Sequence, residues 1–126
     1  MKNPYFKKIC DGYRNLRNTE LIFVGLSQDD GSLNEIRALA RRGHFTSKVK
    51  IVSTDFNLRS QKLNAAIDNA SPETQMFLFH HPRSILDPKS IEILSLNKYR
   101  EKIWGAFSHE FDFVHPLLNF TSFYSN

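Results

Sequence analysis

The fold is decided by residues 21–52, which read LIFVGLSQDDGSLNEIRALARRGHFTSKVKIV. This stretch begins with the apolar run Leu21–Val24 and closes with a second apolar group, Val49–Val52. Short continuous apolar runs are typical of strands that are covered on both faces. The residues between them carry apolar side chains such as Ile36 and Leu39 among charged ones, as a surface helix does. The stretch therefore predicts a strand, a helix and a second strand.

Both ends of this helix are marked in the sequence. Ser32, with Glu35 three residues later, forms a capping-box pattern, which predicts a helix opening at Ser32. Gly43 is the residue type that commonly ends a helix in the left-handed conformation. We therefore expect the helix to close at Gly43.

The flanking sequence adds further elements on both sides. Apolar side chains at helical spacing predict a first helix between Pro4 and Arg17 and another around Leu63–Ala70. Met76–Phe79 is a third apolar run and is expected to be a third strand. Asp87-Pro88 reads as an N-cap followed by the first helical position. Alternation from Ile103 to Phe113 suggests a half-exposed strand.

This order of elements predicts the fold class and the place of a ligand. We expect an α/β fold over residues 1–126 as a single domain, with a three-layer, mostly parallel sheet and helices on both faces. In such sheets a ligand sits beyond the carboxyl ends of the strands. Three loops follow the expected strands and are nominated on this ground: Gly25–Ser32, Ser53–Arg59 and His80–Leu86.

The composition sets limits on partners and compartment. A net charge of +4 favours phosphate-bearing partners, whether nucleic acid, anionic lipid or nucleotide. No apolar run approaches the roughly 18 residues of a membrane span, and we expect no secretory signal behind Met1. The single cysteine, Cys10, excludes a disulfide framework within the chain, so a cytoplasmic location is expected.

Motifs in the nominated loops and downstream of them carry a resemblance to a known family. Arg59–Ala66 reads RSQKLNAA and is followed by the apolar run at Met76–Phe79. Further along come WGAF at 104–107, FD at 111–112 and HPLL at 115–118. In this order and spacing they resemble family 2-type glycosyltransferases, in which an Arg precedes a helix bearing Asn-Ala. The resemblance covers about Glu20 to Asn126, as the N-terminal part of such an enzyme.

The resemblance implies a GT-A fold that binds a nucleotide-sugar, with a lipid or glycan as acceptor. Val24 to Ser32 stands where the family has its nucleotide loop, which nominates Asp29 and Asp30 for the sugar. Arg59, at a strand-to-helix loop, is nominated for a phosphate, and Arg83 for the charge that a metal ion would otherwise supply. The family also implies Mg²⁺ or Mn²⁺ as cofactor.

The chain departs from the family pattern at several positions. No strand resembling the family's first one precedes Leu21, and Gly25 stands where the nucleotide loop has its first Asp. Pro82 occupies the position of the metal-binding Asp. The second half of the family's domain, with its catalytic base, lies beyond Asn126. We therefore assign no catalytic or metal-binding residue and expect a truncated, degenerate member of the family.

Other interpretations of the same residues stay open. Asp29-Asp30 also suits an ordinary turn, Arg59 a solvated helix start and Arg83 a surface side chain, and the five histidines suit capping or packing better than zinc. The chain as a whole also suits a non-catalytic remnant, a partner-dependent interaction module or a basic nucleic-acid-binding α/β module. The Phe-rich C-terminal part suggests either uncovered core or a lipid-facing or partner surface, including one for self-association.

Overall fold

A computed structural model describes residues 5–28, 31–55, 57–81 and 84–94 of the chain. The chain divides into two units, Met1–Ile93 and Leu94–Asn126. The described residues belong to the first unit, apart from Leu94, at which the last helix ends. The strand expected at Ile103–Phe113 and the Phe-rich C-terminal part lie outside the described residues.

A pair of parallel strands forms the sheet. β1 (Glu20–Leu26) and β2 (Lys48–Thr54) run in register from Glu20 opposite Lys48 to Leu26 opposite Thr54. The helix α2 (Ser32–Arg41) connects them, which gives the strand–helix–strand unit that a parallel pair requires. The first two predicted strands and the α/β character of the chain are therefore confirmed.

The two ends of α2 differ in how well the sequence predicted them. α2 begins at Ser32, where the sequence predicted its start, but its N-cap residue is Gly31, with φ of 89°, rather than Ser32. Glycine adopts this left-handed conformation at little cost, so the helix begins one residue earlier than a Ser32 cap would allow. At the other end, Gly43 has φ of 72° and closes the helix as expected. The amides of Gly43 and His44 donate to the carbonyls of Ala40 at 3.1 Å and Leu39 at 3.0 Å, as in a Schellman motif.

The first helix, α1, is shorter than the sequence suggested. It spans Phe6–Gly12 rather than reaching Arg17. The amides of Tyr13 and Arg14 bond three residues back, at 3.1 and 3.2 Å, so the helix tightens into a turn there. Tyr13 and Leu16 are nevertheless buried, because the turn directs both side chains into the core. Helical spacing thus identified the core residues but overestimated the helix.

The core lies on the face of the sheet that α1 and α2 cover. It is built from the helices, from the turns that follow them and from the segment before the last helix: Ile9, Cys10, Tyr13, Leu16, Leu33, Ile36, Phe45 and Leu86. Alternate strand residues pack against it, namely Leu21, Phe23, Val49 and Ile51. These four are the inward-facing set of two neighbouring strands.

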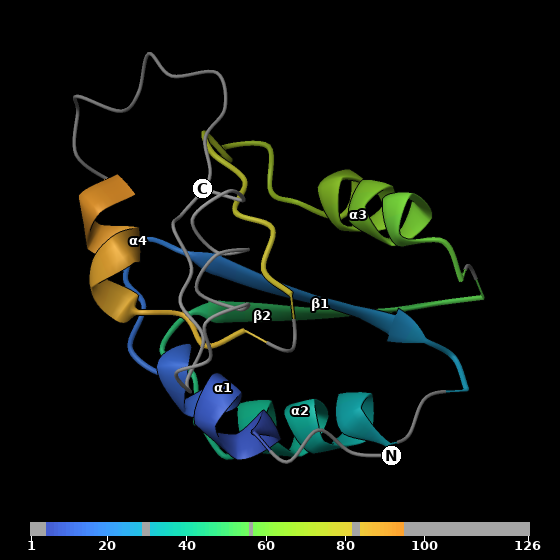
Figure 1. Cartoon of the computed structure of the whole chain (residues 1–126), viewed down its shortest axis with the longest axis horizontal. Coiled ribbons are helices and arrows are strands. Elements are labelled where there is room, and N and C mark those ends of the chain that lie inside the picture. The colour runs from blue at the N-terminus through green and yellow to red at the C-terminus, as the bar shows by residue number, and fades with distance from the viewer. Residues whose placement is uncertain (1–4, 29–30, 56, 82–83, 95–126) are drawn as a thin grey trace, which may run out of the picture. The chain divides into compact units, whose positions relative to one another are not determined.

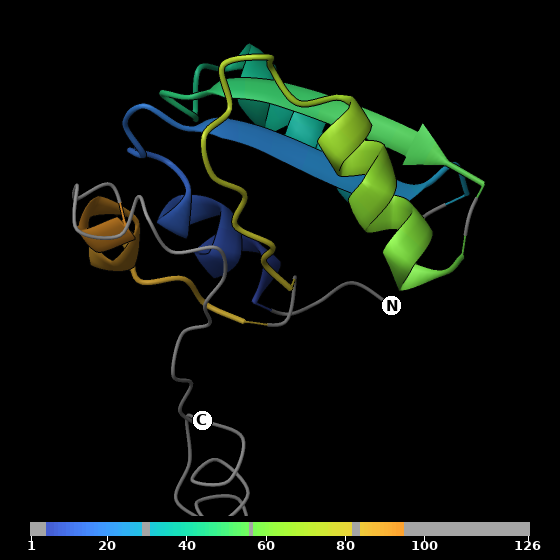
Figure 2. The same ribbon diagram turned by 90° about the horizontal axis from the view of Figure 1, so that it is seen from above.

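A third helix, α3 (Arg59–Asp68), lies on the opposite face of the two strands (Figures 1 and 2). None of its residues is buried, and Ile67 is 40% exposed. The last helix, α4 (Pro88–Leu94), begins as predicted, since the Lys89 amide donates to Asp87 Oδ1 at 3.0 Å. Its residue Ile91 packs against the core.

The strand predicted at Met76–Phe79 is wrong. Within the described part of the chain the sheet has two strands, and this segment has no regular secondary structure. Its four side chains are between 38% and 48% exposed, and the rings of Phe77 and Phe79 stack on each other with centroids 6.2 Å apart. Apolar side chains indicate a tendency to be buried, whereas a strand also requires a neighbour with matching backbone groups.

Candidate functional site

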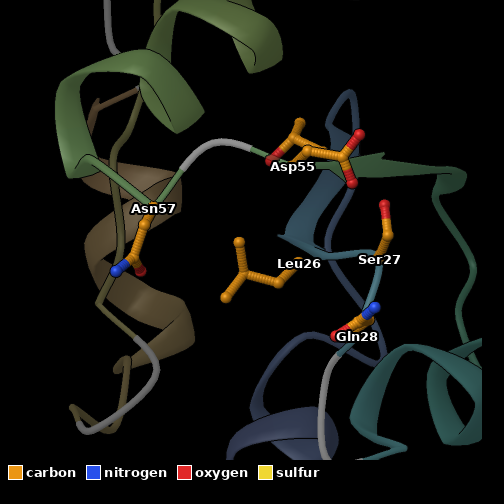
Figure 3. A pocket seen from close by; sticks show the side chains of 6 residues that line it. Leu26, Ser27, Gln28, Asp55 and Asn57 are labelled. Carbon is orange, nitrogen blue, oxygen red and sulfur yellow. The ribbon is translucent and has the colours of Figure 1, made fainter.

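A depression lies where β1 and β2 end, at their carboxyl termini (Figure 3). Its volume is about 370 Å³. The lining residues come from the ends of the two strands and the loops that follow: Leu26, Ser27, Gln28, Thr54, Asp55 and Asn57. Two of the three loops nominated from the sequence therefore meet at the place expected for a ligand in a parallel sheet.

The backbone holds the two loops together at this point. The Ser27 amide donates to the Thr54 carbonyl at 2.9 Å, which extends the strand pairing by one residue beyond Leu26. Thr54 is only 8% exposed, although it is polar. Asp55, which follows it directly, is exposed. The strand ends are thus fixed, while the side chains beyond them are open to solvent.

The lining side chains are suited to bind a neutral, hydroxyl-bearing group. Among the described lining residues, Asp55 supplies a negative charge, Gln28 and Asn57 supply amides, and Ser27 and Thr54 supply hydroxyls. Figure 3 shows the side chain of Leu26 in the middle, between Asn57 on one side and Ser27 and Gln28 on the other. The site therefore combines an apolar centre with donors and acceptors around it, as small-molecule sites commonly do.

The start of α3 follows directly after the depression. Leu58 is the N-cap residue, with extended φ and ψ of −73° and 133°, and no side chain caps the helix. The first amides of an uncapped helix are free to bind an anion, and the helix dipole favours one there. Arg59, the first helical residue, is exposed and stands two residues after Asn57. A cation and a helix N-terminus thus adjoin the depression.

The residues nominated from the sequence have different outcomes. Arg59 lies at the helix start where it was expected, whereas Asp29, Asp30 and Arg83 lie outside the described residues. None of the described residues of the third nominated loop, His80–Leu86, lines the depression.

Two residues that the sequence did not single out contribute to the site. Asp55 and Asn57 fall inside the nominated loop Ser53–Arg59 and line the depression. A signal was present, because a carboxylate directly after a strand in an α/β unit stands at the ligand-binding edge of the sheet. The family resemblance instead drew attention to the aspartates of the preceding loop.

A second group of ionisable side chains lies away from the depression, beside α1. Burial, with a smaller contribution from Asp11, raises the pKa of the Cys10 thiol to about 11. Burial also raises the pKa of Tyr13, with Cys10 contributing. The Tyr13 hydroxyl is hydrogen-bonded to Nδ1 of His80. Burial, followed by the charge of His81, lowers the pKa of His80. His80 thus has the packing role that was one expectation for the histidines.

The described residues do not supply a donor set for the divalent metal ion that the family resemblance implies. Pro82, at the position of the family's metal-binding Asp, has no side-chain donor atom. Within residues 5–28, 31–55, 57–81 and 84–94, no group of three His, Cys, Asp or Glu side chains is placed to hold a metal ion. Asp55 is a single carboxylate, whereas Mg²⁺ and Mn²⁺ prefer several oxygen ligands.

No family model, curated protein or solved structure matches this chain. No helix in the described part of the chain has the length and apolarity needed to cross a membrane.

Proposed function

We propose that the chain is a glycosyltransferase-like protein that binds a nucleotide-sugar at the carboxyl ends of β1 and β2. The observation that supports this most is the joining of three features at one sheet edge. These are a depression lined with hydroxyl, amide and carboxylate groups, an uncapped helix N-terminus, and Arg59 at that terminus. A nucleotide diphosphosugar needs both kinds of surface, since it carries hydroxyl-rich rings and a diphosphate.

The charges assign the two parts of the ligand. Asp55 would repel a phosphate, so the hydroxyls of a ribose or sugar belong beside it, where the carboxylate accepts their hydrogen bonds. The diphosphate belongs at Arg59 and the first amides of α3, where a cation and the helix dipole act together. Asp29, Asp30 and Arg83 stay in the proposal as residues that the family resemblance nominates.

The proposed fold is the GT-A type, a three-layer sheet of which β1, β2 and the helices on either face would be one part. Sugar transfer also requires a base for the acceptor hydroxyl and a stabilised leaving diphosphate. Since Pro82 replaces the family's metal ligand, the proposal is limited to binding. Arginine side chains take the place of the metal ion toward the diphosphate.

The test is calorimetric titration of the whole chain with uridine diphosphate, guanosine diphosphate and their glucose and mannose conjugates. We expect Arg59→Ala to weaken binding by about 1–3 kcal/mol, which is the range for losing a hydrogen bond to a charged group. Lys62→Ala is the matched control, because it removes a cation one turn further along α3, and it should change the affinity little. Adding Mg²⁺ or Mn²⁺ should also change it little.

Two results would contradict the proposal. If none of the nucleotides tested binds, the proposed nucleotide-sugar binding is wrong. Equal losses for Arg59→Ala and Lys62→Ala would indicate that net charge alone attracts the ligand, as expected of a basic nucleic-acid-binding module.

A further inference from the structure

The segment of residues 71–80 crosses the molecule between two side-chain anchors. At its start, the Ser71 amide and hydroxyl donate to the two carboxylate oxygens of Glu20, at 3.2 and 2.6 Å. At its end, the Tyr13 hydroxyl is hydrogen-bonded to His80 Nδ1. Between these anchors, residues 72–79 are exposed and have no regular secondary structure beyond a turn. The 71–80 segment is therefore held mainly at its two ends.

The His80 anchor depends on the protonation state of the imidazole. A neutral imidazole carries one ring proton, on Nδ1 or on Nε2, so either Nδ1 or the Tyr13 hydroxyl can be the acceptor of this bond. The Nε2 atom is buried and has no hydrogen-bond partner. The two rings also meet edge to face, with centroids 5.4 Å apart and planes at 88°. Protonation gives both ring nitrogens a proton, so the charged ring has a buried N–H at Nε2 without a hydrogen-bond partner, which is costly.

The groups around His80 do not compensate for such a charge. Tyr13 contacts it from the turn after α1, and Cys10 on α1 interacts with Tyr13; burial keeps both neutral at ordinary pH, with the pKa of Cys10 at about 11. His81, its neighbour along the chain, adds positive charge when it is protonated. The nearest carboxylate on α1, Asp11, has its Oδ1 atom 3.4 Å from Nε2 of His44 instead.

We propose that the 71–80 segment is a pH-sensitive strap, whose His80 end detaches from Tyr13 when His80 is protonated. Its Ser71 end stays bound to Glu20 until that carboxylate is itself protonated at lower pH. Mild acid therefore opens the strap at one end and exposes the Tyr13 side of the core, while stronger acid opens both ends.

The direction of the pH dependence follows from linkage. The pKa of His80 in the folded chain lies below its ordinary value of 6.5. The closed strap is therefore fully stable above about pH 6.5 and loses stability as the pH falls from there through the folded pKa. The Glu20 pKa is lowered from 4.5, mainly by the Ser71 hydroxyl. The anchor between Ser71 and Glu20 is thus lost only below about pH 4.5, so the two ends of the strap detach at different pH values.

The chain carries a convenient reporter for this motion. It has two methionines, Met1 and Met76, and Met76 lies within the 71–80 segment. Methionine labelled with ¹³C at the methyl group gives one resonance for the strap and one for the N-terminus. On titration from pH 8 to 5, we expect the Met76 methyl signal to shift with a midpoint below 6.5, together with the His80 ring signal. The Met1 methyl signal should not follow that titration.

Three variants distinguish detachment of the His80 end of the strap from other effects of acid on the chain. His80→Gln cannot be protonated in this range and should abolish the Met76 transition. His81→Gln removes a neighbouring positive charge and should raise the midpoint. Tyr13→Phe keeps the buried ring but removes the hydrogen bond, so Met76 should already show its low-pH shift at pH 8.

The proposal is overturned if the Met76 transition persists in His80→Gln. It is also overturned if, in the unaltered chain, the His80 ring titrates without any change at Met76. The second measurement needs no variant, so it remains decisive even where a substitution prevents folding.

Discussion

The two faces of the β1–β2 pair are covered in different ways. On one face, α1 and α2 press buried side chains such as Ile9, Leu33 and Ile36 against the strands, and each of these is at most 6% exposed. On the other face, α3 buries no residue, and Ile67 remains 40% exposed. The same small sheet thus has a packed face and a lightly covered one, with α1 and α2 on the first face and α3 on the second.

The lightly covered face is attached by polar contacts at one end. Glu20, the first residue of β1, binds Ser71 just beyond α3. Lys50 Nζ lies 3.2 Å from Glu20 Oε1 and donates to the Asn69 carbonyl at 2.6 Å. The buried apolar side chains thus gather on the α1–α2 face, whereas the chain just beyond α3 is held to the strands by hydrogen bonds and an ion pair. Since α3 begins beside the proposed site, the layer that would meet a ligand is the less firmly held one.

The largest expected effect tests this contrast directly. Ile36→Ala should destabilise the chain by about 2–5 kcal/mol, because it removes a buried side chain and leaves a cavity. Ile67→Ala, on the exposed side of α3, should change the free energy of unfolding by no more than about 0.5 kcal/mol. Urea unfolding followed by circular dichroism gives both values. Comparable losses for the two variants would mean that α3 is packed as tightly as α2.

The contrast also explains which elements the sequence predicted. The two strands at Leu21–Val24 and Val49–Val52 were predicted correctly because their apolar side chains are sandwiched between helical layers. The run at Met76–Phe79 looks the same in sequence, but its side chains stay half exposed and it has no strand partner. Apolarity alone does not distinguish these cases, because pairing depends on a neighbour that is distant in sequence.

The site was predicted in position but only partly in detail. The rule that ligands bind at the carboxyl ends of parallel strands located the depression, and the loop nomination included Asp55 and Asn57. It did not show which side chains line the depression, because that depends on how each loop turns after its strand. His80 was nominated within a ligand loop, yet it contacts Tyr13, a partner 67 residues away.

A second effect concerns how closely α2 approaches β1. A Cβ atom at Gly25 would lie 3.0 Å from Leu33 side-chain carbons, which is tighter than ordinary contact. Gly25→Ala should therefore cost about 1–3 kcal/mol through overpacking. If this contact is the cause, the same substitution should cost clearly less in a Leu33→Ala background, which provides room for the added methyl group. An equal cost in both backgrounds, measured by urea unfolding, would instead point to the backbone at Gly25.

The smallest expected effect concerns the polar attachment of the α3 face. Glu20→Gln keeps the shape of the side chain but removes its charge, which Ser71 and Lys50 bind. We expect a loss of about 1 kcal/mol at pH 7, the usual net contribution of such a bond. The hydrogen bond from the Ser71 hydroxyl lowers the Glu20 pKa below 4.5. The greater stability of the wild-type chain over Glu20→Gln should thus be complete above that pH and disappear as the pH falls through the folded pKa of Glu20.

Asp68→Asn, which neutralises an exposed carboxylate in α3, is the control and should show little effect at either pH. If Glu20→Gln costs the same at pH 7 and at pH 3, shape rather than charge holds this end of α3, and the proposed second release of the strap fails with it.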